Sequence, residues 1–294
     1  MKKNWLLSYL ALGVTWGASF LFIEKSLTFL TPVGVAFSRC FLGSISLWII
    51  LVTRKIIVEW DFILVSQLWI MGLLLNVFPG ILFAYAQEHV SSILAGIINA
   101  LTPIMSVIMI MVVFRNEKLK FERLFGIIMG FVGVFITLVA GNSIGEYSLS
   151  AVLALILAVL CYGISYPFSS RFITPRGIPS EFLATTQVSL SAITLLPFFI
   201  ISGIHSYDIS TGAALSIFCL GVLGTGVAYI WNFRITQLAG AAIASTVTYL
   251  TPIVAVVLGL VFLGEPLTWN EPLGGLIVLV GSAITQGRIR LARR

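Results

Sequence analysis

The stretch Ile97-Ile-Asn-Ala-Leu-Thr-Pro-Ile-Met-Ser-Val107 and its counterpart Thr246-Val-Thr-Tyr-Leu-Thr-Pro-Ile-Val-Ala-Val256 share Leu-Thr-Pro-Ile in the same register. Each lies near the middle of an apolar run of more than ~20 residues, the length that crosses a hydrocarbon core of roughly 30 Å. Pro103 and Pro252 are therefore predicted to lie at the midplane of a membrane.

Both prolines are predicted to break their helices. Proline lacks a backbone N–H and crowds the carbonyl four residues back, so Pro103 frees the carbonyl of Asn99 and Pro252 that of Thr248. In lipid an unpaired carbonyl is costly, so such breaks are tolerated inside the protein or at a wet cavity. Paired interruptions in matching halves are typical of a transporter's binding site. The alternative is a pair of kinks that serve packing alone.

The composition predicts a lipid bilayer as the surroundings of the chain. Of its 294 residues 59% are hydrophobic and only 10% are charged, which is more apolar surface than a water-soluble fold can bury. The net charge of +6 comes from short basic pieces between apolar runs rather than from a continuous basic face, which argues against a nucleic-acid partner. The three cysteines lie within apolar runs and do not form a disulfide framework.

Ten charge-poor runs predict ten transmembrane spans, with boundaries uncertain by a few residues. They run from Trp5 to Ile23, Val33 to Val52, Phe62 to Ala86, Ser91 to Phe114, Glu122 to Ala140, Leu149 to Phe172, Glu181 to Ser202, Thr211 to Thr236, Gly240 to Leu263 and Glu271 to Gly287. With the N-terminus inside, 15 of the 17 Lys and Arg residues fall inside, Lys25 falls outside and Arg39 lies within a span. The positive-inside rule then predicts a multi-pass protein of the cytoplasmic (inner) membrane with both termini cytoplasmic.

The two halves repeat one another, which predicts a first repeat over residues 1–142, a second over 143–287 and a basic tail over 288–294. Five spans per repeat is an odd number, so the second repeat must enter the membrane from the opposite side. The fold class is therefore an all-α integral membrane protein with two inverted five-helix repeats. The matching pairs are Trp16-Gly-Ala-Ser-Phe20 with Tyr162-Gly-Ile-Ser-Tyr166, Gly72 and Asn76 with Gly221 and Thr225, Glu117-x-Leu with Glu265-x-Leu, and Gly126 and Gly133 with Gly274 and Gly281.

These motifs together resemble the EamA type of the drug/metabolite transporter superfamily. The resemblance covers the whole chain in both copies, with one departure, because Phe114-Arg-Asn-Glu117 has one residue more than Leu263-Gly-Glu265. It implies a ten-helix carrier whose central cavity is lined mainly by spans 1, 3, 4, 6, 8 and 9. Many proteins of this type export amino acids and other small metabolites, and no cofactor is implied.

Polar and aromatic side chains at mid-depth are the residues expected to bind a small-molecule substrate. Large amphipathic rings away from the membrane interfaces suit a cavity wall, and Tyr162 and Tyr166 share one helical face. The alternatives are plain packing of the rings and hydrogen bonds between helices. The expected substrate-binding residues are Trp16, Ser19, Arg39, Asn76, Asn99, Thr102, Tyr162, Ser165, Thr225, Tyr229, Thr248 and Thr251.

Arg39 is the one charged residue well inside a predicted span. A buried guanidinium costs about 3 kcal/mol on insertion scales and tends to face a cavity, a carbonyl or a carboxylate. Three interpretations stay open: capture of an anionic substrate group, pairing with Glu24 or Glu88, and a side chain that extends to the outer headgroups.

Four other features have structural interpretations. Glu117 and Glu265 are expected to cap the following span or tether a linker. Gly126-x-x-x-Gly130 indicates either close helix packing or the contact face of a homodimer. His89 and His205 have no metal-ligating neighbours in sequence, so no metal is expected. Trp48, Trp60, Trp69 and Trp269 lie at span ends and are expected to anchor the interfaces.

The sequence favours a secondary transporter that exports a small metabolite by alternating access. It has no Walker loop, no Gly-x-Ser-x-Gly and no Cys-x-x-Cys, so we expect no enzymatic activity. The alternatives are a channel and, less favoured, a membrane enzyme. No acidic residue falls at the midplane, which predicts facilitated diffusion or exchange of a neutral or zwitterionic metabolite without a coupling ion. Glu24 and Glu88, at span ends, are the first residues to test against this expectation.

Overall fold

Apolar helices of membrane length make up the structure, a computed structural model that describes residues 5–58, 61–112, 121–139, 148–206 and 209–289. Within these residues nine helical segments are long and apolar enough to cross a membrane. The tenth predicted span corresponds to α14 (Asn270–Thr285), an apolar helix of 16 residues that falls short of that length. The expected all-α membrane fold is confirmed, whereas the count of ten full-length spans is not.

The helices follow the predicted spans closely. The first half contains α1 (Trp5–Ser26), α2 (Pro32–Thr53), α3 (Phe62–Gly72), α4 (Phe78–Gln87), α5 (Ser92–Asn99), α6 (Thr102–Val112) and α7 (Phe121–Val139). The second half contains α8 (Leu149–Phe168), α9 (Ser180–Ser202), α10 (Thr211–Gly221), α11 (Ala228–Ala239), α12 (Ala241–Ser245), α13 (Thr251–Leu258) and α14. Four segments have the wider π-helical turn: Leu73–Val77, Ser169–Ile173, Val222–Val227 and Gly259–Leu263. Two short 3₁₀ segments are Thr174–Arg176 and Thr246–Tyr249.

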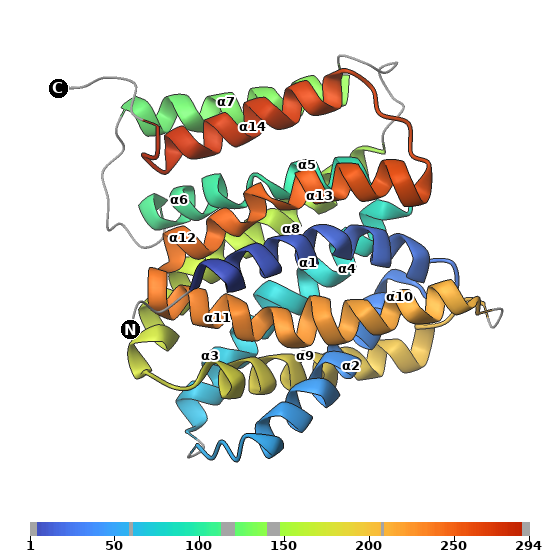
Figure 1. Cartoon of the computed structure of the whole chain (residues 1–294), viewed down its shortest axis with the longest axis vertical. Helices are drawn as coiled ribbons and strands as arrows, with labels where there is room; N and C mark the ends of the chain where they lie inside the picture. The colour runs from blue at the N-terminus through green and yellow to red at the C-terminus, as the bar shows by residue number, and fades with distance from the viewer. Residues whose placement is uncertain (1–4, 59–60, 113–120, 140–147, 207–208, 290–294) are drawn as a thin grey trace.

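The helices lie roughly parallel to one another in successive layers (Figure 1). α7 and α14 lie side by side at one edge, α5, α6, α12 and α13 come next, and α2, α3 and α9 form the other edge. α1 runs through the middle, between α13 and the pair α10 and α11. The start of α1 and the end of α14 lie at the same end of the bundle, which we call the N-side end.

Two ion pairs fasten connections at the N-side end. Arg54, after α2, contacts Glu181 at the start of α9 with an N–O distance of 2.6 Å. Arg176, before α9, contacts Asp61 at the start of α3 at 2.6 Å. The hydrogen bond from Arg176 holds the pKa of the exposed Asp61 carboxyl below its usual value. The link between α2 and α3 is thus tied to the link between α8 and α9, as inverted repeats require.

The opposite end is closed by backbone contacts between the other pair of connections. Leu30, after α1, forms a single antiparallel bridge with Ile204, after α9. The hydroxyl of Thr31 donates to the carbonyl of Ser202 at 2.6 Å. The connections therefore alternate between the two ends along the chain, which is the arrangement that a multi-pass bundle needs.

Glycines allow α7 and α14 to touch backbone to backbone. A Cβ added at Gly133 would lie 2.7 Å from the carbonyl oxygen of Gly274, and one at Gly281 would lie 2.7 Å from that of Gly126. A Cβ at Gly130 would collide with the side chain of Ile104. The glycines of the predicted small-residue face therefore serve close helix packing within the chain, and a homodimer contact stays a prediction.

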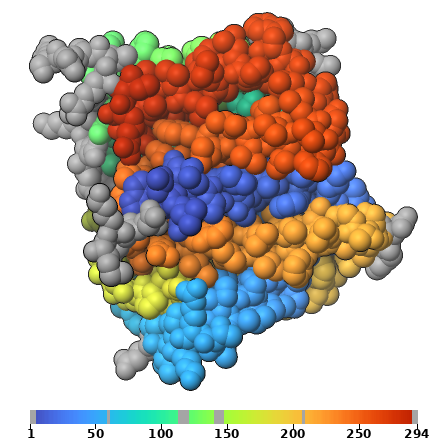
Figure 2. Space-filling view, viewed as in Figure 1, coloured from blue at the N-terminus to red at the C-terminus, as the bar shows by residue number. Residues whose placement is uncertain are grey.

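The outer surface is apolar, as a bilayer requires. Figure 2 shows α14, α13, α1, α10 with α11, and α2 as successive bands on one face. On α1 the side chains of Leu6, Leu7, Leu10 and Val14 are exposed on the outside of the bundle. Such continuous apolar exposure would be unfavourable in water and is favourable against lipid tails.

Candidate functional site

The two predicted helix breaks are present and lie at corresponding places. α5 ends at Asn99 and α6 begins at Thr102, while a 3₁₀ segment, Thr246–Tyr249, separates α12 from α13. The hydroxyl of Thr102 donates to the carbonyl of Asn99 at 2.8 Å, and that of Thr251 donates to the carbonyl of Thr248 at 2.9 Å. Each carbonyl that a proline frees is thus bound by the threonine immediately before that proline.

The breaks also touch each other across the centre of the bundle. The side-chain amide of Asn99 donates to the hydroxyl of Thr251 at 3.2 Å. Asn99 is 5% exposed and Thr251 is fully buried, so this bond is shielded from solvent and lipid. One polar contact therefore joins the two Leu-Thr-Pro-Ile motifs, which come from opposite halves of the chain.

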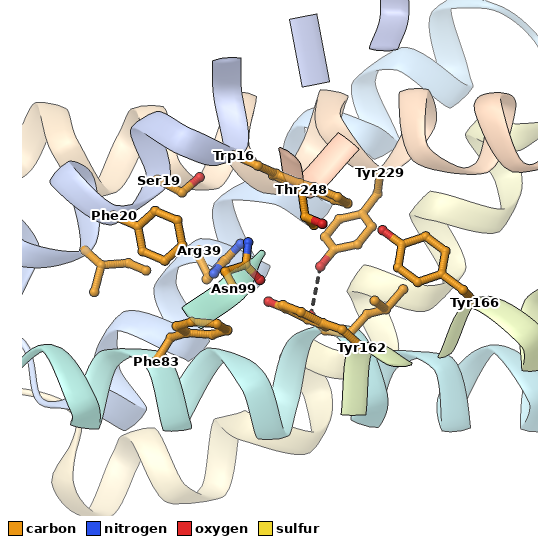
Figure 3. Close-up of a pocket in the computed structure, with 12 residues that line it drawn as sticks. Trp16, Ser19, Phe20, Arg39, Phe83, Asn99, Tyr162, Tyr166, Tyr229 and Thr248 are labelled. Atoms are coloured by element: carbon orange, nitrogen blue, oxygen red, sulfur yellow. Dashed lines mark hydrogen bonds between the residues drawn. The ribbon is translucent and has the colours of Figure 1, made fainter. Parts of the chain in front are cut away.

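A cavity lies beside this crossing, and we call it the central cavity (Figure 3). The space between its walls is about 520 Å³. Half of the described lining residues are aromatic, and its polar groups come from α1, α2, α5, α8, α11 and the segment before α13. The lining residues are Trp16, Ser19, Phe20, Ile23, Arg39, Leu75, Phe83, Asn99, Tyr162, Tyr166, Tyr229 and Thr248.

Arg39 brings a positive charge into the central cavity. Its side chain extends from α2 and is 6% exposed. The Nε atom donates to the hydroxyl of Thr225 at 2.9 Å, and that hydroxyl donates in turn to the carbonyl of Leu220 at 3.0 Å. Within the described residues the two terminal guanidinium nitrogens make no hydrogen bond or ion pair. Arg39 is therefore held at one edge of its planar group and presents the other edge to the cavity.

The aromatic wall is held in place by hydrogen bonds and ring contacts. The indole nitrogen of Trp16 donates to the carbonyl of Gly224 at 3.3 Å, and the hydroxyl of Tyr229 donates to that of Leu75 at 2.9 Å (Figure 3). The rings of Trp16 and Tyr229 meet edge to face at 6.0 Å. The accepting carbonyls belong to the π-helical segments Leu73–Val77 and Val222–Val227, whose wider turns leave carbonyls accessible to side chains.

Comparison with known proteins identifies the family. The sequence model of the EamA-like transporter family matches residues 3–139 and matches again over residues 149–286. This chain belongs to the EamA-like transporter family.

Several curated relatives of this EamA-like chain are named as transporters, none of them as an enzyme. The uncharacterized transporter YdfC of Bacillus subtilis is 28% identical over 92% of this chain and 87% of its own. An uncharacterized transporter of Archaeoglobus fulgidus is 28% identical over 95% of this chain and 97% of its own. A probable terminal-alkyne amino-acid exporter of Streptantibioticus cattleyicolor is 26% identical over 73% of this chain and 70% of its own.

The fold has a solved counterpart. A crystal structure covers 97% of this chain and 96% of its own with a TM-score of 0.69 at 16% identity. At that identity the likeness concerns the fold alone. The protein is thus a multi-pass membrane transporter with the EamA-like fold.

Seven of the twelve expected substrate-binding residues line the central cavity: Trp16, Ser19, Arg39, Asn99, Tyr162, Tyr229 and Thr248. Tyr166, expected as part of a cavity wall, lines it as well. Their contact with a substrate stays a prediction. Four apolar lining residues were not predicted, because an apolar side chain facing a cavity has the same sequence pattern as one in a packed core. They are Phe20, Ile23, Leu75 and Phe83.

The other five expected residues do not line the central cavity and lie behind the residues that do. Thr102 and Thr251 are fully buried on the proline-freed carbonyls, and Ser165 donates to the carbonyl of Tyr162 at 2.7 Å. Asn76 donates to the hydroxyl of Ser191 at 3.1 Å, which is the interhelical bond of the alternative interpretation. Thr225 acts through Arg39. Hydroxyls and amides at mid-depth therefore serve the backbone and neighbouring helices as often as the cavity.

Two expectations for Arg39 are wrong. Within the described residues it forms no ion pair with Glu24 or with Glu88, which is exposed. It also does not extend to the headgroups, because its side chain is buried and its Nε is bound to Thr225. The third interpretation, capture of an anionic substrate group, is not contradicted by this geometry and stays a prediction.

Glu265 caps a helix, but not the one that follows it. Its carboxylate accepts hydrogen bonds from the backbone N–H groups of Ser92 and Ile93 at 2.8 and 3.2 Å and from the Ser92 hydroxyl at 3.0 Å. These groups begin α5, so a residue of the second half closes a helix start in the first half. Its counterpart, Glu117, lies outside the described residues.

The lining of the central cavity contains no acidic side chain. The acids nearest the bundle interior lie toward the end opposite the N-side end: Glu24 is half-buried in the last turn of α1, and Glu271 is buried where it caps α14. One carboxylate oxygen of Glu24 is buried without a hydrogen-bond partner among the described residues. The described part contains no cluster of His, Cys, Asp and Glu that could hold a metal ion.

Proposed function

We propose that this transporter exports a small zwitterionic metabolite of the amino-acid class by alternating access. The observation that carries the proposal is Arg39, whose charge is buried and whose terminal nitrogens make no hydrogen bond within the described residues. A desolvated guanidinium is stabilised by a carboxylate that binds its two parallel N–H groups. The substrate's carboxylate would supply the missing partner.

The aromatic side chains of the cavity wall favour a substrate that also carries an ammonium group. The rings of Trp16, Tyr162 and Tyr229 surround the cavity next to Arg39 (Figure 3). A cation over such ring faces gains about 0.5–2 kcal/mol, more when it is desolvated. A zwitterion would satisfy both regions at once, whereas a simple anion or amine would satisfy one. The Streptantibioticus cattleyicolor relative, named as a probable amino-acid exporter, is consistent with this class.

The proposed driving force is the substrate's own gradient. Coupled carriers usually place a carboxylate where it can sense both substrate and ion, and the central cavity has none in its lining. Facilitated diffusion or exchange would then run outward whenever the cytoplasmic pool is larger. The N-side end is proposed to face the cytoplasm, on the basis of the distribution of Lys and Arg.

The test is counterflow in proteoliposomes without an ion gradient. An amino-acid mixture trapped inside should accelerate uptake of a labelled amino acid, while the matching methyl esters, which lack the carboxylate charge, should not. Arg39→Lys should lower the rate at least roughly tenfold, since a charged hydrogen bond is worth about 1.5–3 kcal/mol and a planar fork differs from a point charge. The control is Arg54→Lys, whose guanidinium lies in the exposed ion pair with Glu181.

Three results would contradict the proposal. Equal rates for Arg39→Lys and the parent would remove Arg39 from substrate binding. Linear, unsaturable flux without counterflow would favour a channel. Transport that needs a proton or sodium gradient and is lost in Glu24→Gln or Glu88→Gln would replace uncoupled exchange with ion coupling through those carboxylates.

A further inference from the structure

A second cavity lies at the N-side end of the bundle, among α6, α7, α8, α12 and α14. The space between its walls is about 570 Å³. Its lining includes Ser106, Arg123, Tyr166, Ser245 and Gln286. We call it the N-side cavity. Its walls come from both halves of the chain.

Tyr166 is the residue that the two cavities have in common. Its side chain is 4% exposed and closes one end of the central cavity (Figure 3). Ser106 and Val107, which line the N-side cavity, follow the proline break after Asn99 by one to two turns of α6. One aromatic ring therefore separates two spaces that follow each other along the direction of transport.

The N-side cavity repeats the chemistry of the central one. Among the described residues its lining contains one basic side chain, Arg123, which also has another interaction, and no acidic side chain. The hydroxyl of Ser106 is buried and has no hydrogen-bond partner among the described residues, although the side chain is only 3% exposed. The amide of Gln286 donates to the hydroxyl of Ser245 at 3.0 Å, which leaves its carbonyl oxygen available. An unpartnered buried hydroxyl in a cavity that a basic side chain also lines is suited to a carboxylate-bearing guest.

The backbone next to Tyr166 has two irregularities that permit a local rotation of the helix. Pro167 follows it inside α8, removes one helical N–H and frees the carbonyl of Gly163. A π-helical segment, Ser169–Ile173, begins two residues later. No described residue hydrogen-bonds to the Tyr166 hydroxyl, in contrast to Tyr229, whose hydroxyl is fixed to Leu75. A small rotation at this break would withdraw the ring without disturbing the rest of α8.

We propose that the N-side cavity is a second substrate site, which binds the same carboxylate-bearing metabolite before it passes Tyr166 into the central cavity. This proposal rests on the proposed function, because it takes its ligand class from the central cavity. Two sites in series with a movable ring between them would let the protein hold a substrate at one end while the central site is closed to that end.

The experiment uses single cysteines in the full-length chain, after Cys40, Cys161 and Cys219 have been replaced by alanine. Ser106→Cys reports on the N-side cavity and Thr248→Cys on the central one. A negatively charged, water-soluble methanethiosulfonate is applied to vesicles that expose the N-side end. The ligand probe is a mixture of the proteinogenic amino acids, and the control is the matching mixture of methyl esters.

Ser106→Cys should be labelled quickly, and the amino-acid mixture, but not the esters, should slow that labelling at least about threefold, as expected for a site mostly occupied by ligand. Thr248→Cys should be labelled slowly from this side. Adding Tyr166→Ala should raise its labelling rate by about tenfold or more, equivalent to about 1.4 kcal/mol of barrier. Tyr166→Phe keeps the ring and should leave the rate unchanged, which separates the partition from general damage to the fold.

The outcomes separate the two proposals. Protection of Thr248→Cys without protection of Ser106→Cys would overturn the second site and leave the proposed function standing. Protection of neither would contradict the proposed function, and with it this inference. A Thr248→Cys labelling rate that Tyr166→Ala does not change would overturn the role of Tyr166 as the partition.

Discussion

The proposed role of Arg39 depends on Thr225, a residue that orients the guanidinium and that the substrate would not touch. Thr225, in the π-helical segment Val222–Val227, accepts from the Arg39 Nε at 2.9 Å and donates to the carbonyl of Leu220 in the last turn of α10. The hydroxyl therefore fixes the rotation of the guanidinium plane. Positioning of this kind determines whether both terminal nitrogens can meet one carboxylate at the same time.

Thr225→Val is expected to raise the KM for counterflow roughly fivefold to tenfold with little change in maximal rate, because a lost hydrogen bond to a charged group is worth about 1–2 kcal/mol. Thr225→Ser keeps the hydroxyl and should restore the parent KM. Thr236→Val, a buried threonine that donates to the carbonyl of Asn232 away from the cavity, is the control. Equal KM values for Thr225→Val and Thr236→Val would show that Arg39 does not depend on Thr225.

The threonines of the Leu-Thr-Pro-Ile motifs should matter for stability instead. Thr102→Val and Thr251→Val each leave a proline-freed carbonyl without its hydroxyl partner, at an expected cost of about 1–3 kcal/mol. Thermal unfolding in detergent should show a lower midpoint for both variants than for Thr236→Val, since the Asn232 carbonyl keeps its helical partner. Midpoints equal to that control would mean that water or a neighbouring group replaces the hydroxyl.

At the scale of helices, the contact between α7 and α14 depends on glycines, which have no side chain to separate the two backbones. Gly133→Ala would place a Cβ 2.7 Å from the Gly274 carbonyl oxygen and 2.8 Å from the Val278 nitrogen, so the two helices must separate. Gly275→Ala adds the same methyl group to α14, where the nearest atom lies 3.6 Å away. We expect Gly133→Ala to lower the unfolding midpoint by several degrees and Gly275→Ala to leave it unchanged. An unchanged midpoint for both variants would contradict backbone-to-backbone packing.

The sequence predicts helix breaks better than helix geometry. Pro103 and Pro252 mark both breaks because their effect is covalent and local. The π-helical segment Leu73–Val77 has such a signal in Pro79, which frees the carbonyl of Leu75, although the partner that binds this carbonyl, Tyr229, comes from the other half of the chain. The same holds for the site. Arg39 could be predicted from the cost of its charge, whereas Phe20 and Leu75 could not, since a cavity and a core both favour apolar side chains.

At the scale of the whole molecule, the alternation of the connections predicts the sidedness of individual residues. Lys25 lies where α1 ends, at the far end from the N-side, and Arg176 lies at the N-side end, where it pairs with Asp61. Single cysteines at these two positions should react with impermeant reagents from opposite faces of the membrane. Labelling of both from the same face would contradict the arrangement of the bundle.

The motif pairs also account for how much of the architecture could be predicted. The pairs that lie within the described residues fall at corresponding places in the two halves, and Asn99 meets Thr251 where the repeats cross. The tenth helix is short because the apolar run predicted from Glu271 to Gly287 is itself short, and α14 fills nearly all of it, from Asn270 to Thr285.

The hydrogen bonds from Ser92 and Ile93 to Glu265 have a consequence for the synthesis of the protein. The two partners are 173 residues apart, and at roughly 5–20 residues per second the ribosome needs about 9–35 s to deliver Glu265 after Ser92. Throughout that interval the bare N–H groups at the start of α5 and the glycine groove of α7 lack their partners. The first half of the chain must therefore remain in the membrane for that interval without these stabilising contacts.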